Sequence, residues 1–230
     1  MVVLELPQKE GCEGLEKSYD DLSHGRKTPD ELIKDLPGSE FPKFEEKLYA
    51  AIYRTGKTVL CEHSPLGISD MQKADQLYNW RISGVAVEEA LRKYKEVLRE
   101  LSILNKRRDI ALARQLRALV MDKPSSSILV VRGAGHERTL KASLEGAGVH
   151  FTIYHSHEPL LLLHESVVTS MLAFGEEPSQ LDLLKCLIEP LVLGPRPPTQ
   201  VNIAGVRQRM STLSESDLRD QVGRMVNPKS

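Results

Sequence analysis

The amino-acid sequence predicts an α/β protein with a mostly parallel sheet flanked by helices and with a long, charged helical insertion. Short apolar runs rich in β-branched residues alternate with segments whose apolar residues recur at helical spacing, a pattern typical of strands that alternate with helices. Residues 128–154 carry a strand pattern, a helix pattern and a second strand pattern in close succession. Such a βαβ unit implies two parallel strands joined by a right-handed crossover.

The amino-terminal part of the chain is predicted to contain two strands and a few short helices. We expect, in order, a strand at 2–6 that Pro7 ends, one or two short helices within 8–42, a helix at 44–55 and a strand at 58–61. Thr28 should begin one of the short helices, because its side chain can cap the first turn and Pro29 suits the first helical position.

The rest of the chain is predicted to be more helical. We expect two helices between 87 and 120 with a break near 105–108, a strand at 128–132, a helix at 137–145, a strand at 149–154, and helices near 162–174 and 180–187. A break at Gly194 to Pro198 divides an α/β domain, residues 1–195, from residues 196–230. The second segment is expected to be a weakly ordered tail with one short helix, capped at Ser214 and running to about Val226.

Composition excludes several classes of protein. The 230 residues include 31 basic and 32 acidic side chains, so no strong field favours nucleic acid or an anionic membrane. The three cysteines are widely spaced and show no metal-finger pattern, which favours reduced thiols in a cytoplasmic protein. No signal peptide is visible, and the most apolar window, Pro159 to Leu163, is too short to cross a bilayer.

His136 is the first candidate for chemistry. It follows the strand pattern ILVVR and the turn Gly133-Ala134-Gly135, so it should lie at the carboxyl end of a buried strand, where ligands bind in open α/β sheets. The Gly-x-Gly pattern also occurs in dinucleotide-binding proteins, but Arg138 stands where that fingerprint needs a small residue. Backbone N–H groups at the following helix start could hold an anion.

Two acids occupy similar places in the pattern. Glu5 and Glu62 each lie in or just after a short apolar run and are followed shortly by proline. A carboxylate buried there must bind a cation, accept hydrogen bonds or stay protonated, and the simpler alternative is that each is exposed to water. Parallel strands would bring both acids and His136 to one edge of the sheet.

Other polar residues have simpler explanations that the sequence favours. His155 and His157 share a face if the strand continues and could bind a metal with His164, but surface or strand-end histidines are the more common case. His63 is similar. Arg107, Arg108 and Asp109 stand in an otherwise regular helix, and their spacing alone indicates ordinary solvated charge.

An ordered set of motifs between residues 107 and 148 resembles a known superfamily. The segment RRDIALARQLRAL is followed by the strand ILVV, by Gly-Ala-Gly-His and by LEGAGV. This set, which covers about a fifth of the chain, is similar to the superfamily that groups TraB/PrgY-type proteins, Tiki proteases, erythromycin esterases and ChaN-like haem-binding proteins. Glu5, in VVLELP, resembles the strand-end glutamate of that superfamily more loosely.

The resemblance implies a site. In that superfamily two Gly-x-x-His motifs and a glutamate converge on a proposed metal or catalytic centre. Gly133 and His136 match the second motif, Arg108 the family arginine and Glu5 the carboxylate. No first Gly-x-x-His precedes Glu5, so we expect either a missing preceding segment or a member that has lost half of the site.

The resemblance and the strand-end pattern together predict a metal-dependent hydrolase of ester or peptide bonds. His136 and Glu5 would bind a divalent metal or exchange protons, and Arg108 would steady an oxyanion or a substrate carboxylate. Gly133, Gly135, Glu62 and Asp109 are the expected ligand-binding residues. The substrate would be a small molecule or a peptide, and an oligomer is possible. The alternatives are a haem or small-ligand binding protein with His136 as axial ligand, and a degenerate interaction scaffold.

Overall fold

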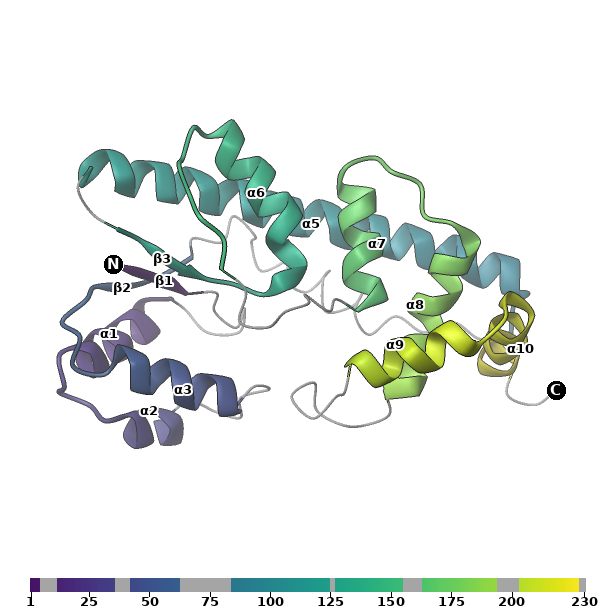
Figure 1. Cartoon of the computed structure of the whole chain (residues 1–230), viewed down its shortest axis with the longest axis horizontal. Helices are drawn as coiled ribbons and strands as arrows, with labels where there is room; N and C mark the ends of the chain where they lie inside the picture. The colour runs from purple at the N-terminus through teal and green to yellow at the C-terminus, as the bar shows by residue number, and fades with distance from the viewer. Residues whose placement is uncertain are drawn as a thin grey trace. The chain divides into compact units, whose positions relative to one another are not determined.

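The computed structural model describes residues 1–4, 12–35, 42–62, 84–124, 127–154, 163–193 and 203–227. It shows a mixed α/β protein in which a small parallel sheet accompanies a larger number of helices (Figure 1). The chain divides into two compact units. The first comprises residues 1–63, 115–133 and 196–200, and the second comprises residues 64–114, 134–195 and 201–230.

The first unit contains the described sheet. Its strands are β1 (Val2–Leu4), β2 (Val59–Cys61) and β3 (Leu129–Val131), and β1 lies in the centre, parallel to both neighbours. Val3 stands opposite Leu60 on one side and Val130 on the other. Each strand lies inside an apolar run predicted from the sequence. The sheet is small, with three residues in each strand, so the description that holds is a mixed α/β fold with a small parallel sheet.

Three helices gather beside this sheet (Figure 1): α1 (Cys12–Ser23), α2 (Pro29–Asp35) and α3 (Pro42–Ile52). Their apolar residues form a core with the inner residues of β2, made of Leu15, Tyr19, Leu22, Leu32, Tyr49, Ile52, Val59 and Cys61. Helix α2 begins at Pro29 as the sequence predicts, because the Thr28 hydroxyl accepts the N–H of Glu31 at 3.3 Å and the Glu31 carboxylate accepts the N–H of Thr28 at 2.7 Å.

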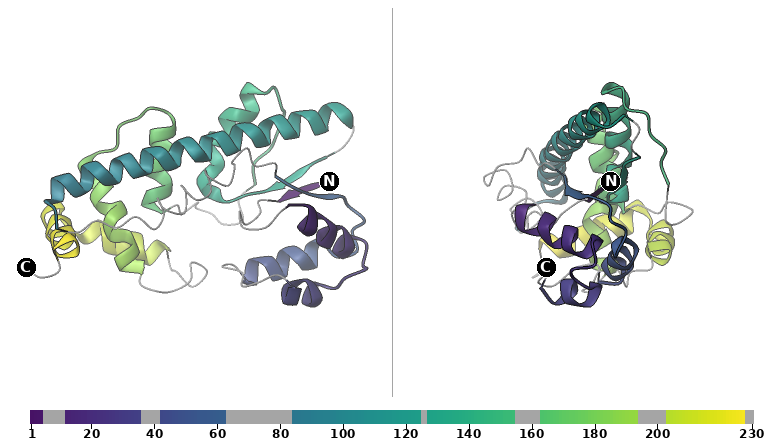
Figure 2. Two further views of the ribbon diagram at one scale, coloured as in Figure 1. Left: turned by 180° about the vertical axis from the view of Figure 1, so that it is seen from behind. Right: turned by 90° about the vertical axis from the view of Figure 1, so that its left-hand side faces the viewer.

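Helix α5 (Val87–Asp122) is continuous, so the predicted break near 105–108 is wrong (Figure 2). The chain has no glycine or proline between 87 and 122, and nothing local interrupts the helical hydrogen bonds. The buried face also continues through this segment at helical spacing, at Leu98, Leu101, Leu104, Arg108 and Leu112. Lys106 and Arg107 are exposed and Arg108 belongs to the buried face, so the run of charges does not interrupt the helix.

The second unit is helical. A short 3₁₀ turn, η1 (Ala134–His136), leads into α6 (Glu137–Gly146), and α7 (His164–Ala173) and α8 (Gln180–Leu193) follow. The predicted strand at 149–154 does not form: these residues lie in no ladder, and Tyr154 is 86% exposed. A strand needs a neighbour to pair with, and an apolar β-branched run does not supply one by itself. Helix α6 ends instead in a turn at Gly148, with φ of 68°, where the N–H of Val149 donates to the carbonyl of Leu144 at 3.0 Å.

The carboxyl-terminal residues are packed into this unit, in contrast to the weakly ordered tail with one helix that the sequence predicts. Two helices occupy the segment, α9 (Ile203–Thr212) and α10 (Glu215–Val226). Val206 and Met210 of α9, and Leu218, Val222 and Val226 of α10, repeat at helical spacing and are buried against α5 and α8. The cap at Ser214 and the end at Val226 are confirmed. The division of the chain at residue 195 stays a prediction.

Within the described ranges, no helix combines the length and apolarity that crossing a membrane requires.

Candidate functional site

His136 stands at the junction of η1 and α6. It is the N-cap residue of α6, and its ring makes no cap hydrogen bond to the helix. The imidazole is turned elsewhere and is 14% exposed. This placement follows from the sequence, because the Gly-Ala-Gly turn after β3 ends the strand and Glu137 begins a helix with an acid in its first turn.

The partner of His136 is Asp109, on the buried face of α5. The His136 Nδ1 atom lies 3.1 Å from Asp109 Oδ1 and 3.3 Å from Asp109 Oδ2. The Asp109 side chain is fully buried, and the Thr139 hydroxyl of α6 donates a second hydrogen bond to its Oδ2 atom. The buried carboxylate therefore fixes the orientation of the ring and favours the tautomer in which Nδ1 carries the proton. In that tautomer Nε2 is the ring nitrogen with the lone pair, so it is the one that can accept a proton.

Arg108 and Asp109 are buried, in contrast to the solvated charges that their spacing indicated. Arg108 is 7% exposed and Asp109 is 0% exposed, whereas the preceding Arg107 is exposed. A buried arginine in a helix interior is costly unless its charge is matched. The role that the resemblance implies for Arg108 stays a prediction.

Glu62 has a cationic partner in the first unit. It directly follows β2, and Arg132 directly follows β3, so the two residues flank the end of the central strand β1. Their side chains form an ion pair in which Glu62 is 5% exposed and Arg132 is 4% exposed. The positive charge of the Arg132 guanidinium thus compensates for burying the Glu62 carboxylate. Binding to a cation is one of the three possibilities that the sequence analysis gave for such an acid. This pairing accounts for Glu62 without a ligand.

Glu5 lies outside the described residues, as do His63, His155 and His157. Glu62 belongs to the first unit and His136 to the second. The expectation that Glu5, Glu62 and His136 share one edge of the sheet therefore stays a prediction.

Gly135 is required by close packing. A Cβ atom at this position would lie 3.1 Å from Ser166 Oγ and 3.3 Å from Ser166 Cβ, so Ser166 would have to shift by a few tenths of an ångström to admit a side chain. Gly133 is exposed. Gly135, the second glycine of the Gly-Ala-Gly turn, thus has a packing role, because it lies directly against Ser166 of α7.

The second unit contains another histidine–carboxylate pair, which the sequence analysis missed. His164 opens α7, and its Nδ1 atom lies 3.1 Å from Oε1 of Glu189 in α8. Glu189 is 2% exposed. The signal that could have revealed the pair is an acid inside the apolar helix run LLKCLIEPL, because such a carboxylate needs a partner.

The described residues contain no group of three or more His, Cys, Asp or Glu side chains arranged to hold a metal. The Asp109 carboxylate is turned to His136 Nδ1 and to Thr139, so the described residues offer His136 Nε2 as one candidate ligand atom. Of the cysteines, Cys186 is buried, and burial beside Glu189 raises the pKa of its thiol, which makes it a poor metal ligand or nucleophile.

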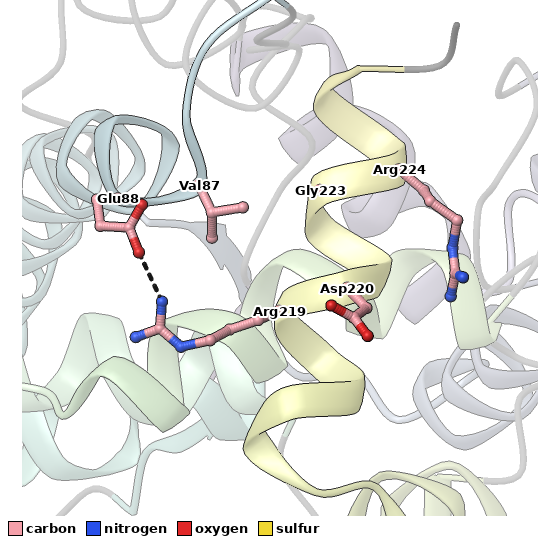
Figure 3. A pocket seen from close by; sticks show the side chains of 6 residues that line it. All are labelled: Val87, Glu88, Arg219, Asp220, Gly223 and Arg224. Carbon is pink, nitrogen blue, oxygen red and sulfur yellow. Dashed lines mark hydrogen bonds and ion pairs between the residues drawn. The ribbon is translucent and has the colours of Figure 1, made fainter. Parts of the chain in front are cut away.

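A surface pocket elsewhere in this unit lies at the start of α5 against α10 (Figure 3). It is lined by Val87, Glu88, Arg219, Asp220, Gly223 and Arg224. Arg219 donates to Glu88 at 2.8 Å across it and to Glu215 at 3.1 Å, so these charges stabilise the contact between the two helices. The pocket therefore has a structural explanation, and the candidate site remains the region of His136.

No family model, curated protein or solved structure matches this chain.

Proposed function

We propose that the protein is a hydrolase of ester or peptide bonds in which His136 activates the attacking water. One observation carries this proposal: the fully buried Asp109 holds Nδ1 of the partly exposed His136 at 3.1 Å. A buried carboxylate that accepts from one nitrogen of a partly exposed imidazole is the arrangement by which enzymes orient a general base. The substrate would be a small molecule or a peptide, and we place the reaction in the cytoplasm.

The proposed step uses His136 as the proton acceptor. Nε2 takes a proton from water as the water oxygen attacks the carbonyl carbon, and the Asp109 carboxylate stabilises the imidazolium that forms. Thr139 also holds the carboxylate in place, because its hydroxyl donates to Oδ2. Arg108, or the backbone N–H groups at the start of α6, would stabilise the negative charge that develops on the carbonyl oxygen.

Binding a divalent metal is the alternative role for this ring nitrogen, because an Nε2 atom that binds a metal has no lone pair left to accept a proton. His136 Nε2 and Glu5 would bind the metal, as the resemblance to the TraB, Tiki and erythromycin esterase superfamily implies, and the metal would polarise the carbonyl or lower the pKa of water. The buried carboxylate behind Nδ1 supports this, since metal-binding histidines usually donate their other ring N–H to such a group. We also propose that this chain has the more extended, mostly parallel sheet of that superfamily.

The test is hydrolysis by the full chain of p-nitrophenyl butyrate and of a peptide p-nitroanilide, with and without added Zn²⁺. His136→Gln and Asp109→Asn should each lower kcat/KM by about 100-fold or more, the usual contribution of general acid–base catalysis. His24→Gln is the matched control: His24 also pairs through Nδ1 with a carboxylate, Asp20 at 3.2 Å, but both side chains are more than 40% exposed. Wild-type activity in His136→Gln, or no hydrolysis of either substrate, contradicts the proposal.

A haem-binding role makes a different prediction. Haem bound through His136 would give a Soret band on titration of the protein that His136→Gln removes and His24→Gln keeps. That result, together with the absence of hydrolysis, would replace the hydrolase proposal.

A further inference from the structure

Two hydrogen bonds to one buried carboxylate fix the position of His164. Glu189 accepts two hydrogen bonds from this one residue: the backbone N–H of His164 donates to Oε2 at 2.8 Å, and the ring Nδ1 lies 3.1 Å from Oε1. The ring is therefore oriented by a buried carboxylate through the same nitrogen as His136, and its Nε2 atom is the one left for proton exchange.

The two histidines lie on segments that touch. Gly135, the residue before His136, approaches Ser166 so closely that a Cβ atom would lie 3.1 Å from its hydroxyl oxygen. Ser166 is in the first turn of α7, which His164 opens. The packing of η1 on the start of α7 thus brings both histidines to one region of the second unit.

The exposure of the two pairs distinguishes them from a surface pair. The His136 and His164 side chains are 14% and 20% exposed, while their carboxylate partners are 0% and 3% exposed. In the surface pair of His24 and Asp20 both partners are about equally exposed, at 43% and 44%. A desolvated carboxylate behind a reachable ring is the pattern of an oriented acid–base residue.

The neighbouring acid, Glu165, holds its proton more tightly than an ordinary glutamate does. Glu165 follows His164 on α7, and burial together with the charge of Glu189 raises the pKa of its carboxyl group. Glu165 therefore stays protonated to a higher pH than an ordinary glutamate, and Glu189 is the anion that faces His164.

We propose that His164, oriented by Glu189, is the second acid–base residue of the site, which donates a proton to the leaving group of the bond that His136 helps water to attack. This inference rests on the proposed hydrolase function. The protons balance: His136 Nε2 accepts one from water, the bond between the carbonyl carbon and the leaving oxygen breaks, and the imidazolium form of His164 gives its Nε2 proton to that oxygen and keeps its Nδ1 proton toward Glu189. The products are a carboxylic acid and an alcohol, and solvent returns both rings to their starting states.

The leaving group provides the test. A p-nitrophenolate leaves without protonation, whereas an ethoxide needs a proton, so only the second ester depends on a general acid. The full chain and its His164→Gln, His136→Gln and His24→Gln variants are compared on p-nitrophenyl butyrate and ethyl butyrate. His164→Gln should lower kcat/KM for ethyl butyrate about tenfold or more beyond any loss for p-nitrophenyl butyrate. His136→Gln should lower both alike, and His24→Gln neither.

The ratio of the two rates does not depend on how much of the variant is folded, so a loss of structure cannot imitate the result. An equal loss on both esters, or no loss, in His164→Gln overturns the role of His164 while the function of His136 stands. No hydrolysis of either ester by the wild-type chain overturns both proposals.

Discussion

At the carboxyl ends of β2 and β3, Glu62 and Arg132 make an ion pair with almost no exposure to solvent. Removing one partner of such a pair leaves a buried charge with reduced compensation, which costs more than the pair itself contributes. We expect Arg132→Met to lower the free energy of unfolding by about 3 kcal/mol. Urea denaturation followed by circular dichroism measures this loss.

The matched control is the double variant Glu62→Leu with Arg132→Met, which removes both charges and keeps apolar volume. Replacing a buried pair by apolar side chains is often close to neutral, so the double variant should recover most of the stability. A double variant as unstable as Arg132→Met alone would show that the charge of Glu62 is not the cause of the loss.

Glu165 makes the stability depend on pH in a defined direction. Because its folded-state pKa is raised above the ordinary value of 4.5, the folded protein holds this proton more tightly than the unfolded chain. Its contribution is fully present below pH 4.5 and is lost as the pH rises through the raised pKa. Glu165→Gln should therefore flatten the decline in stability above pH 4.5, measured by urea denaturation across pH, and an unchanged decline would contradict this assignment.

Single residues could be singled out from the sequence more readily than their partners. The burial of Glu62 beside a strand was a recognised possibility, because an acid in an apolar run is conspicuous. Arg132 and Glu189 were not predicted as partners, since Glu62 and Arg132 are 70 positions apart and His164 and Glu189 are 25 apart. Sequence spacing carries no information on which charges the fold will join at such separations.

At the scale of elements, the contact between η1 and α7 depends on Gly135. Gly135→Ala places a methyl group 3.1 Å from Ser166 Oγ, so Ser166 or the adjoining turn of α7 has to shift by a few tenths of an ångström. We expect a loss of about 1–3 kcal/mol, the usual cost of overpacking, measured by thermal denaturation. Gly146→Ala is the control, because a Cβ atom there meets nothing within 4 Å and alanine favours the helix. Adding Ser166→Gly to Gly135→Ala should restore part of the lost stability. A double variant no more stable than Gly135→Ala would show that contact with Ser166 is not the cause of the loss.

Local chemistry explains which elements were predicted correctly. The starts of α2 and α10 follow from capping boxes at Thr28 and Ser214, each complete within four residues. The strand expected at 149–154 failed because a strand exists only with a partner, which local sequence does not specify. The break expected in α5 failed because Lys106 and Arg107 turn to solvent while the buried face continues through Leu104, Arg108 and Leu112.

At the scale of the whole molecule, each compact unit has a core cluster of its own. The cluster in the first unit joins α1, α2 and α3 to β2, and the cluster in the second joins the first half of α5 to α7, α8, α9 and α10. The sequence predicted one domain and a loose tail because α9 and α10 are short and polar on average. Their apolar residues are few, but they recur every fourth position and so form a continuous stripe that binds α8.

Two separate cores predict that stability can be lost in one unit before the other. Leu22 lies in the first core and Leu184 in the second, and both are fully buried. Leu22→Ala and Leu184→Ala should each cost about 2–5 kcal/mol, from lost burial and a residual cavity. Hydrogen exchange read by mass spectrometry should show faster exchange in α1, α2 and α3 for Leu22→Ala, and in α7, α8 and α10 for Leu184→Ala. Uniformly faster exchange in both variants would instead show that the two cores unfold as one cooperative structure, with α5, which contributes residues to both units, as the element that couples them.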